Sequence, residues 1–180
     1  MKKIFIALII ITSLQVIRDI NKNKVIIPTE SIRFRVIANS NTKEDQELKL
    51  KVKNNLEKEI SNTLKTSTNL IASRNTLNNN LLKFENNVKN TLTAEKSNQK
   101  FSINYGMNYF PQKEYKNVIY KAGNYESLVV TLGDGLGENF WCILFPPLCL
   151  LDGEETKKDK VEYHVLVKDI IKKYKTKHHK

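Results

Sequence analysis

The hydrophobic period of the chain changes near residue 100, and this change limits the fold more than any other feature. In the first half, apolar residues recur every four positions, at Leu48, Val52, Leu56, Ile60 and Leu64. This spacing predicts a helix with one apolar stripe, and Thr42 is a suitable N-cap for it. A second, asparagine-rich helix is expected over residues 70–92, although its asparagines have low helix propensity.

After Lys100 the period becomes two, as in Phe101, Ile103 and Tyr105, which predicts β-strands. Further strands are expected over residues 117–120, 127–132, 140–151 and 161–167, with a turn at 122–124 and a helix at 169–174. One strand, residues 32–37, precedes the helices. This order predicts an α+β fold, in which a helix pair covers one face of a largely antiparallel sheet.

The first strand is predicted to have two different faces. Ile32, Phe34 and Val36 would be buried, whereas Arg33 and Arg35 would lie on an exposed, basic face. The turn Asn39–Asn41 then leads into the first helix. Asp45 would lie in the first turn of that helix, where the positive end of the helix dipole stabilises a negative charge.

The segment 133–149 contains three of the six glycines, two of the four prolines, the only tryptophan and both cysteines. If residues 133–141 are extended, the three glycines, Asn139 and Trp141 share one face, and Cys142 lies on the other. A partner backbone would then be able to approach the glycines closely. The alternative is a glycine-rich bend with a buried tryptophan, and the residues alone do not decide between them.

The N-terminus predicts export. A short basic start is followed by the apolar run Ile4–Leu14 and then by Gln15, Val16 and Ile17. As a helix, these fourteen residues reach only about 21 Å, less than the roughly 30 Å of a bilayer core. We expect a signal peptide or signal anchor at 1–20, a linker at 21–30, one domain at 31–171 and a basic, disordered tail at 172–180. An uncleaved anchor would add a membrane surface to the partners of the domain.

Export changes the interpretation of the two cysteines. In an extracytoplasmic domain, Cys142 and Cys149 are expected to form a disulfide, although two buried thiols remain the alternative. A catalytic alternative pairs the Cys142 thiol with His164, the only histidine inside the expected domain, in a hydrolase acting on a cell-wall component. No third residue that would orient such a pair is evident.

Other ligand classes find little support. The glycines lack the spacing of nucleotide-binding motifs, and cysteine and histidine are too few and too widely spaced for a zinc site. The net charge of +11 predicts anionic surroundings, such as a membrane or wall polymer, and a passive wall-binding protein is a further alternative. The lysines lack the interleaved aromatics of single-strand binders. We therefore expect no cofactor, no metal, no nucleic acid and no small-molecule substrate.

Two blocks of sequence resemble the stage II sporulation protein R family of endospore-forming bacteria. The first block comprises 32–40, 44–46 and 48–52, and the second comprises 122–128, 133–142 and 144–149. Two departures are Phe140, where the family tends to carry a second tryptophan, and Lys121, where proline is common. The resemblance implies a protein without catalytic activity that is exported into the space between forespore and mother cell. There it would activate a membrane-embedded aspartic protease, which cleaves the precursor of the early mother-cell sigma factor.

A partner-binding surface follows from these patterns as a hypothesis. We expect it to include Arg33 and Arg35 on the first strand, and Asn39 and Asp45 at the strand–helix junction. It would also include Asn139 and Trp141 at the edge of residues 133–137, here called the glycine segment. Arginine and tryptophan are the residues that most often dominate protein interfaces. The alternatives are a solvated strand face for the arginines and a core position for Trp141.

Overall fold

The computed structural model describes residues 25–27, 29–115, 118–148 and 169–172, together with the single positions Ile6, Ile10 and Thr12. Most of the predicted signal segment, the strand predicted at 161–167, Cys149, His164 and residues 173–180 lie outside the described residues. Within the described ranges, no helix is both long enough and apolar enough to cross a membrane.

Three helices follow one another in the first half of the chain. Helix α2 spans Lys43–Leu64 and begins as predicted, with the Thr42 side chain accepting a hydrogen bond from the Asp45 N–H. Helices α3 (Leu70–Asn79) and α4 (Leu81–Ala94) replace the single helix expected over 70–92. The prediction of one continuous helix was therefore wrong.

Asn80 interrupts this second helical region. Its backbone leaves the helical conformation, at φ −115° and ψ 11°, and its side-chain amide donates to the Thr76 carbonyl oxygen at 2.8 Å. Asparagine side chains compete in this way with the helical hydrogen bonds. The run of asparagines therefore ends one helix and starts another.

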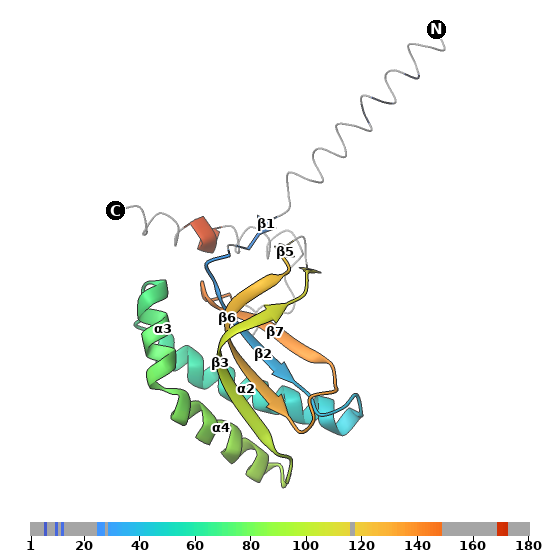
Figure 1. The fold of residues 1–180 in the computed structure, drawn as a ribbon, viewed down its shortest axis with the longest axis vertical. Coiled ribbons are helices and arrows are strands. Elements are labelled where there is room, and N and C mark those ends of the chain that lie inside the picture. Colours follow the sequence, from blue (N-terminus) through green and yellow to red (C-terminus); the bar gives the residue numbers. More distant parts are fainter. Residues whose placement is uncertain are drawn as a thin grey trace.

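Four strands form the main sheet: β2 (Ile32–Ile37), β3 (Phe101–Phe110), β6 (Gly123–Leu132) and β7 (Asn139–Phe145). Their order is β3-β6-β2-β7; β2 runs parallel to β6, whereas the other two pairs are antiparallel. A smaller sheet of β1 (Val25–Ile26), β5 (Val118–Tyr120) and β4 (Lys113–Tyr115) lies at one end of the main sheet (Figure 1). Strand β1 falls within the segment expected as a linker.

The helices cover one face of the main sheet, which confirms the predicted α+β fold (Figure 1). On that face, the apolar positions of β2 and β6 pack against the apolar stripes of the helices. The buried residues are Ile32, Phe34, Val36, Leu128, Val130, Leu132, Leu144 and Phe145 from the strands, and Leu48, Val52, Leu56, Ile60, Leu77, Phe84, Val88 and Leu92 from the helices.

Two strand boundaries differ from the predictions. Strand β6 begins at Gly123, because residues 123–126 pair with β3 instead of forming the expected turn. Strand β7 is shorter than residues 140–151, ends at Phe145, and is followed by a turn at Pro146 and Pro147. Proline lacks the N–H that a further ladder hydrogen bond needs.

The glycine segment is a bend and not an extended strand, so the first of the two alternatives was wrong. Gly133 and Gly135 have φ values of 55° and 67°, a left-handed conformation that residues with a side chain rarely adopt. The extended backbone begins only at Asn139, the first residue of β7.

Candidate functional site

The face of the main sheet opposite α2, α3 and α4, here called the helix-free face, brings four of the predicted residues together. Of the described helical residues, only those of the short segment 169–172 reach this face, where Ile171 packs with Ile143. Arg33 and Arg35 lie on it because they alternate with the buried positions of β2. The antiparallel register then places Trp141 opposite Arg35, and Asn139 opposite Ile37. The register therefore assembles Arg33, Arg35, Asn139 and Trp141 from two neighbouring strands.

Aromatic rings cover the arginines on this face. The Arg33 guanidinium carbon lies 3.3 Å from the ring centroid of Tyr125 and 5.1 Å from that of Phe110. The corresponding carbon of Arg35 lies 4.4 Å from the Trp141 ring. Phe110 and Trp141 make an edge-to-face contact with centroids 5.0 Å apart, which joins the two stacks into one cluster.

The prediction of an exposed arginine face was wrong for Arg33, whose exposed fraction is only 3%. The cause is the aromatic cover from neighbouring strands, because the Tyr125 and Phe110 rings stack on the guanidinium group. The alternation within strand 32–37 carries no sign of this cover. Arg35 is partly buried, so it is neither as exposed as predicted nor as enclosed as Arg33.

Burial makes the electrostatics of both arginines unusual. Loss of solvent lowers the pKa of Arg33, and the nearby Tyr125 and Tyr120 oppose this only in part; loss of solvent also lowers the pKa of Arg35. Both guanidinium groups nevertheless remain charged, since arginine does not deprotonate in proteins. Each Nε is buried and has no hydrogen-bond acceptor. The helix-free face thus contains positive donors that are not satisfied.

A pocket of about 370 Å³ opens beside this cluster, between the helix-free face and the small sheet. Arg33, Asn139 and Trp141 contribute to its wall, and the Asn139 Oδ1 atom is buried without a hydrogen-bond donor. The remaining lining residues are Phe110, Pro111, Lys113, Glu114, Tyr120, Phe140, Cys142, Ile143 and Leu148. The wall is therefore largely apolar, with a few polar atoms, as is usual for binding pockets.

The other two predicted residues, Asn39 and Asp45, form a separate junction. The Asn39 amide nitrogen donates to Asp45 Oδ2 at 2.9 Å, and the Ser40 hydroxyl donates to the same oxygen at 2.6 Å. The Gln99 side chain donates to Asp45 Oδ1. Asp45 is 8% exposed, so it holds the junction together and offers little surface to a partner.

Hydrogen bonding explains the acidity of Asp45. The hydroxyl of Ser40, followed by the amides of Asn39 and Gln99, lowers the pKa of this carboxyl group more than burial raises it. The carboxylate accepts several hydrogen bonds at once, which stabilises its charged form.

The junction also fixes the glycine segment. The Asn39 Oδ1 atom accepts from the Asp134 N–H at 2.9 Å, and the Gly137 N–H donates to the Ala38 carbonyl oxygen at 2.9 Å. A third bond runs from the Glu138 N–H to Asn41 Oδ1 at 2.7 Å. These bonds determine where β7 begins, and so they position Asn139 and Trp141 on the helix-free face.

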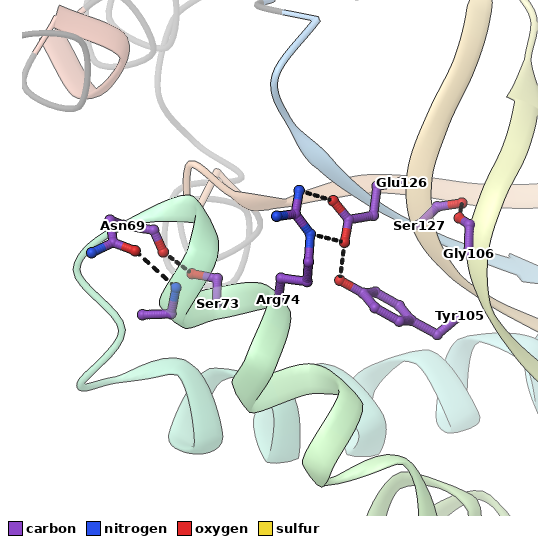
Figure 2. Close-up of polar contacts among 8 residues, drawn as sticks. Asn69, Ser73, Arg74, Tyr105, Gly106, Glu126 and Ser127 are labelled. Carbon is purple, nitrogen blue, oxygen red and sulfur yellow. Dashed lines mark hydrogen bonds and ion pairs between the residues drawn. The ribbon is translucent and has the colours of Figure 1, made fainter. Parts of the chain in front are cut away.

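A polar cluster on the other side of the sheet was not predicted. Arg74 of α3 makes a two-pronged ion pair with Glu126 of β6, with both N–O distances 2.7 Å (Figure 2). The Tyr105 hydroxyl donates to Glu126 Oε1 at 2.7 Å (Figure 2). The cluster connects α3 to the sheet. Its signal in the sequence is a glutamate at an inward position of β6, in line with the buried Leu128 and Val130.

The catalytic alternative gains no support from the described residues. Cys142 lies on β7 and packs against the helix-side core, and the described part of the chain contains no free cysteine. Cys149 and His164 lie outside the described residues, so the disulfide stays a prediction. Within the same ranges, no three histidine, cysteine, aspartate or glutamate side chains converge as a metal site would require.

The fold and the site define a class of protein: a small α+β protein with helices on one face of a mixed sheet and an arginine–aromatic surface on the other. The chain belongs to the stage II sporulation protein R family, whose sequence model matches residues 28–155. Family membership confirms the resemblance and assigns the chain a role in sporulation.

One curated relative shows the extent of the match. The chain is 40% identical over 139 residues to Stage II sporulation protein R of Bacillus subtilis (strain 168), and the alignment covers 76% of this chain and 62% of that protein. The chain thus spans less than two thirds of the relative's length. No solved structure matches the chain.

Proposed function

We propose that the protein is an exported sporulation signal that activates a membrane-embedded aspartic protease of the mother cell. The activated protease then cleaves the precursor of the early mother-cell sigma factor. The signal acts in the space between the forespore and mother-cell membranes, delivered there by its basic and apolar N-terminus. Family membership supports the sporulation role, and the arginine–aromatic cluster on the helix-free face supports action by contact.

The single observation that carries the proposal is the state of Arg33 and Arg35. Both are charged groups with a buried Nε that has no acceptor, and each stacks on an aromatic ring. A buried donor without a partner costs free energy, and a partner protein that supplies an acceptor recovers this cost. Rigid aromatic and arginine side chains are also the usual anchors of interfaces.

Activation by binding has a thermodynamic requirement. The signal activates the protease only by binding its active conformation more tightly than its inactive one. Each tenfold preference corresponds to about 1.4 kcal/mol. An anchor arginine or tryptophan contributes about 2 kcal/mol or more to an interface. If its contact is made only with the active conformation, a single such residue accounts for a shift of more than tenfold.

The test is genetic complementation in a sporulating bacterium whose own family member is deleted. We expect the deletion to stall cells after asymmetric division with the sigma precursor uncut, and the wild-type chain to restore cleavage. Trp141→Ala on the helix-free face should fail to restore it at equal export. The matched control is Leu82→Ala on α4, where the leucine is 70% exposed, and this variant should restore cleavage fully. Restoration by Trp141→Ala but not by Leu82→Ala would refute the assignment of the surface.

A further inference from the structure

The pocket beside the helix-free face contains a buried positive group with few partners. Arg33 is 3% exposed, and its Nε has no acceptor. Among the described residues, its polar partners are the Lys121 carbonyl oxygen, 3.5 Å from the terminal NH2 group, and the Tyr125 side chain. Guanidinium groups in this setting ordinarily pair with a carboxylate, which accepts two parallel hydrogen bonds.

The described residues do not supply that carboxylate. The charged or polar side chains that act on Arg33 are those of Tyr125 and Tyr120. Glu114 lines the same pocket, yet it is not among the groups that act on Arg33, and no ion pair of Arg33 is present within the described ranges. Among the described residues, the positive charge therefore has no carboxylate partner, and it would accept one from another protein.

We infer that this pocket binds one aspartate or glutamate side chain of an extended peptide segment in the partner protein, with Arg33 as the anchor. The inference rests on the proposed function in one respect: the partner that carries the segment would be the protein that this chain activates. The net charge of +11 also favours an acidic partner.

The spacing of the polar atoms suggests the length of the segment. Arg33 pairs with Ile143 across β2 and β7, and Asn139 pairs with Ile37. Four residues along a strand correspond to about 13 Å. A bound segment would place its carboxylate at Arg33 and one of its backbone N–H groups at the unpaired Asn139 Oδ1. About five extended residues span these two positions, and their apolar side chains would face Phe110 and Trp141.

A nucleic acid or a membrane phosphate fits the pocket less well. Such polyanions bind mainly through exposed lysines and arginines that follow the backbone charge, whereas Arg33 is enclosed by aromatic side chains. A pocket of about 370 Å³ has room for one or two side chains, and its walls are mainly apolar.

The experiment uses the intrinsic fluorescence of Trp141, which is the only tryptophan of the chain and lines the pocket. The full chain is titrated with the acetylated pentapeptide amide Phe-Glu-Phe-Ser-Thr and, in parallel, with its Phe-Gln-Phe-Ser-Thr counterpart. Charge-assisted hydrogen bonds are stronger than neutral ones, so we expect the glutamate peptide to bind at least about tenfold more tightly. This comparison needs no variant protein and does not depend on the folding of one.

Two variants test the assignment to Arg33. Arg33→Gln should bind both peptides equally, and Arg33→Lys should retain part of the preference because it keeps the charge but loses the two-pronged geometry. Lys89→Gln is the matched control, since this lysine is exposed on α4 and does not line the pocket, and it should keep the full preference.

Three results would overturn the inference: equal affinity of the two peptides for the wild-type chain, an undiminished preference in Arg33→Gln, or displacement of the glutamate peptide by inorganic phosphate at a similar concentration. The peptide titration is independent of sporulation. If the peptides bind equally while the wild-type chain restores sigma-factor processing, the pocket assignment fails and the proposed function stands. The reverse pair of results would reject the function and keep the pocket.

Discussion

Replacement of Gly137 by alanine should destabilise the protein strongly, because the new methyl group has no room. A Cβ atom at this position would contact the Ser40 carbonyl oxygen, lie 2.6 Å from the Ser40 carbonyl carbon and 2.8 Å from the Ala38 Cβ. These are mainly backbone atoms, which cannot rotate away as the end of a flexible side chain can. The backbone of the glycine segment must therefore move away from the junction.

The size of the effect follows from the contacts that this movement breaks. Overpacking in a well-packed site costs about 1–3 kcal/mol. Moving the segment also lengthens the hydrogen bond from the Gly137 N–H to Ala38, which contributes about 0.5–1.5 kcal/mol. We expect a loss of about 3 kcal/mol in the free energy of unfolding, equivalent to roughly 6–12 °C in Tm for a protein of this size.

Gly106→Ala is the matched control. A Cβ at Gly106 would meet only the side-chain oxygen of Asn104, at an ordinary contact distance of 3.7 Å. We expect its stability to stay within about 1 kcal/mol of the wild type. Urea unfolding followed by Trp141 fluorescence measures both variants. Equal midpoints for Gly137→Ala and the wild type would refute the claim that the junction clamps the glycine segment.

Three further predictions concern other contacts of the fold. Asp45→Asn should lower the free energy of unfolding by about 1–3 kcal/mol at pH 7. Hydrogen bonds from Ser40 and its neighbours lower the pKa of Asp45 in the folded protein. The stabilisation by the carboxylate is therefore present above the unfolded pKa of about 3.9 and is lost as the pH falls through the folded pKa. Urea titrations at pH 7 and pH 3 should therefore show a difference between variant and wild type that shrinks at the lower pH, and a constant difference would contradict the assignment. Arg74→Ala should cost only about 1 kcal/mol, since its ion pair with Glu126 is partly exposed, whereas a loss above about 3 kcal/mol in thermal unfolding would show that the pair behaves as a buried one. If Cys142 and Cys149 form a disulfide, changing either to serine should reduce activity equally in the complementation assay, whereas a loss confined to Cys142→Ser would favour the hydrolase alternative.

Much of the fold was predictable because the sheet is two-sided and its helix-side residues are periodic. Ile32, Phe34 and Val36 alternate strictly with polar residues, and their burial against α2 follows from that alternation alone. Asn80 shows the limit of the same reasoning. The hydrophobic pattern continues from α3 into α4, so periodicity gives no sign of the break that the asparagine side chain introduces.

The sequence indicated which residues form the candidate site better than it indicated their burial and contacts. The residue types of Arg33, Arg35 and Trp141 indicated an interface, and the register places them together. The burial of Arg33 was not predictable, since it depends on the rings of Phe110 and Tyr125. These residues lie on β3 and β6, and the order of the strands in the sheet brings them close to Arg33. Asn39 and Asp45 were expected at an interface, but in the structure they hold the glycine segment, because their hydrogen-bond partners are distant in sequence.

The most direct test of the central claim is site-specific photo-crosslinking between this chain and the membrane-embedded aspartic protease, produced together in one host. A photoreactive amino acid at position 35, on the helix-free face, should crosslink to the protease. The same group at position 82, on the exposed surface of α4, should not. Crosslinking from position 82 and none from position 35 would contradict the account, because it would place the receptor on the helix layer.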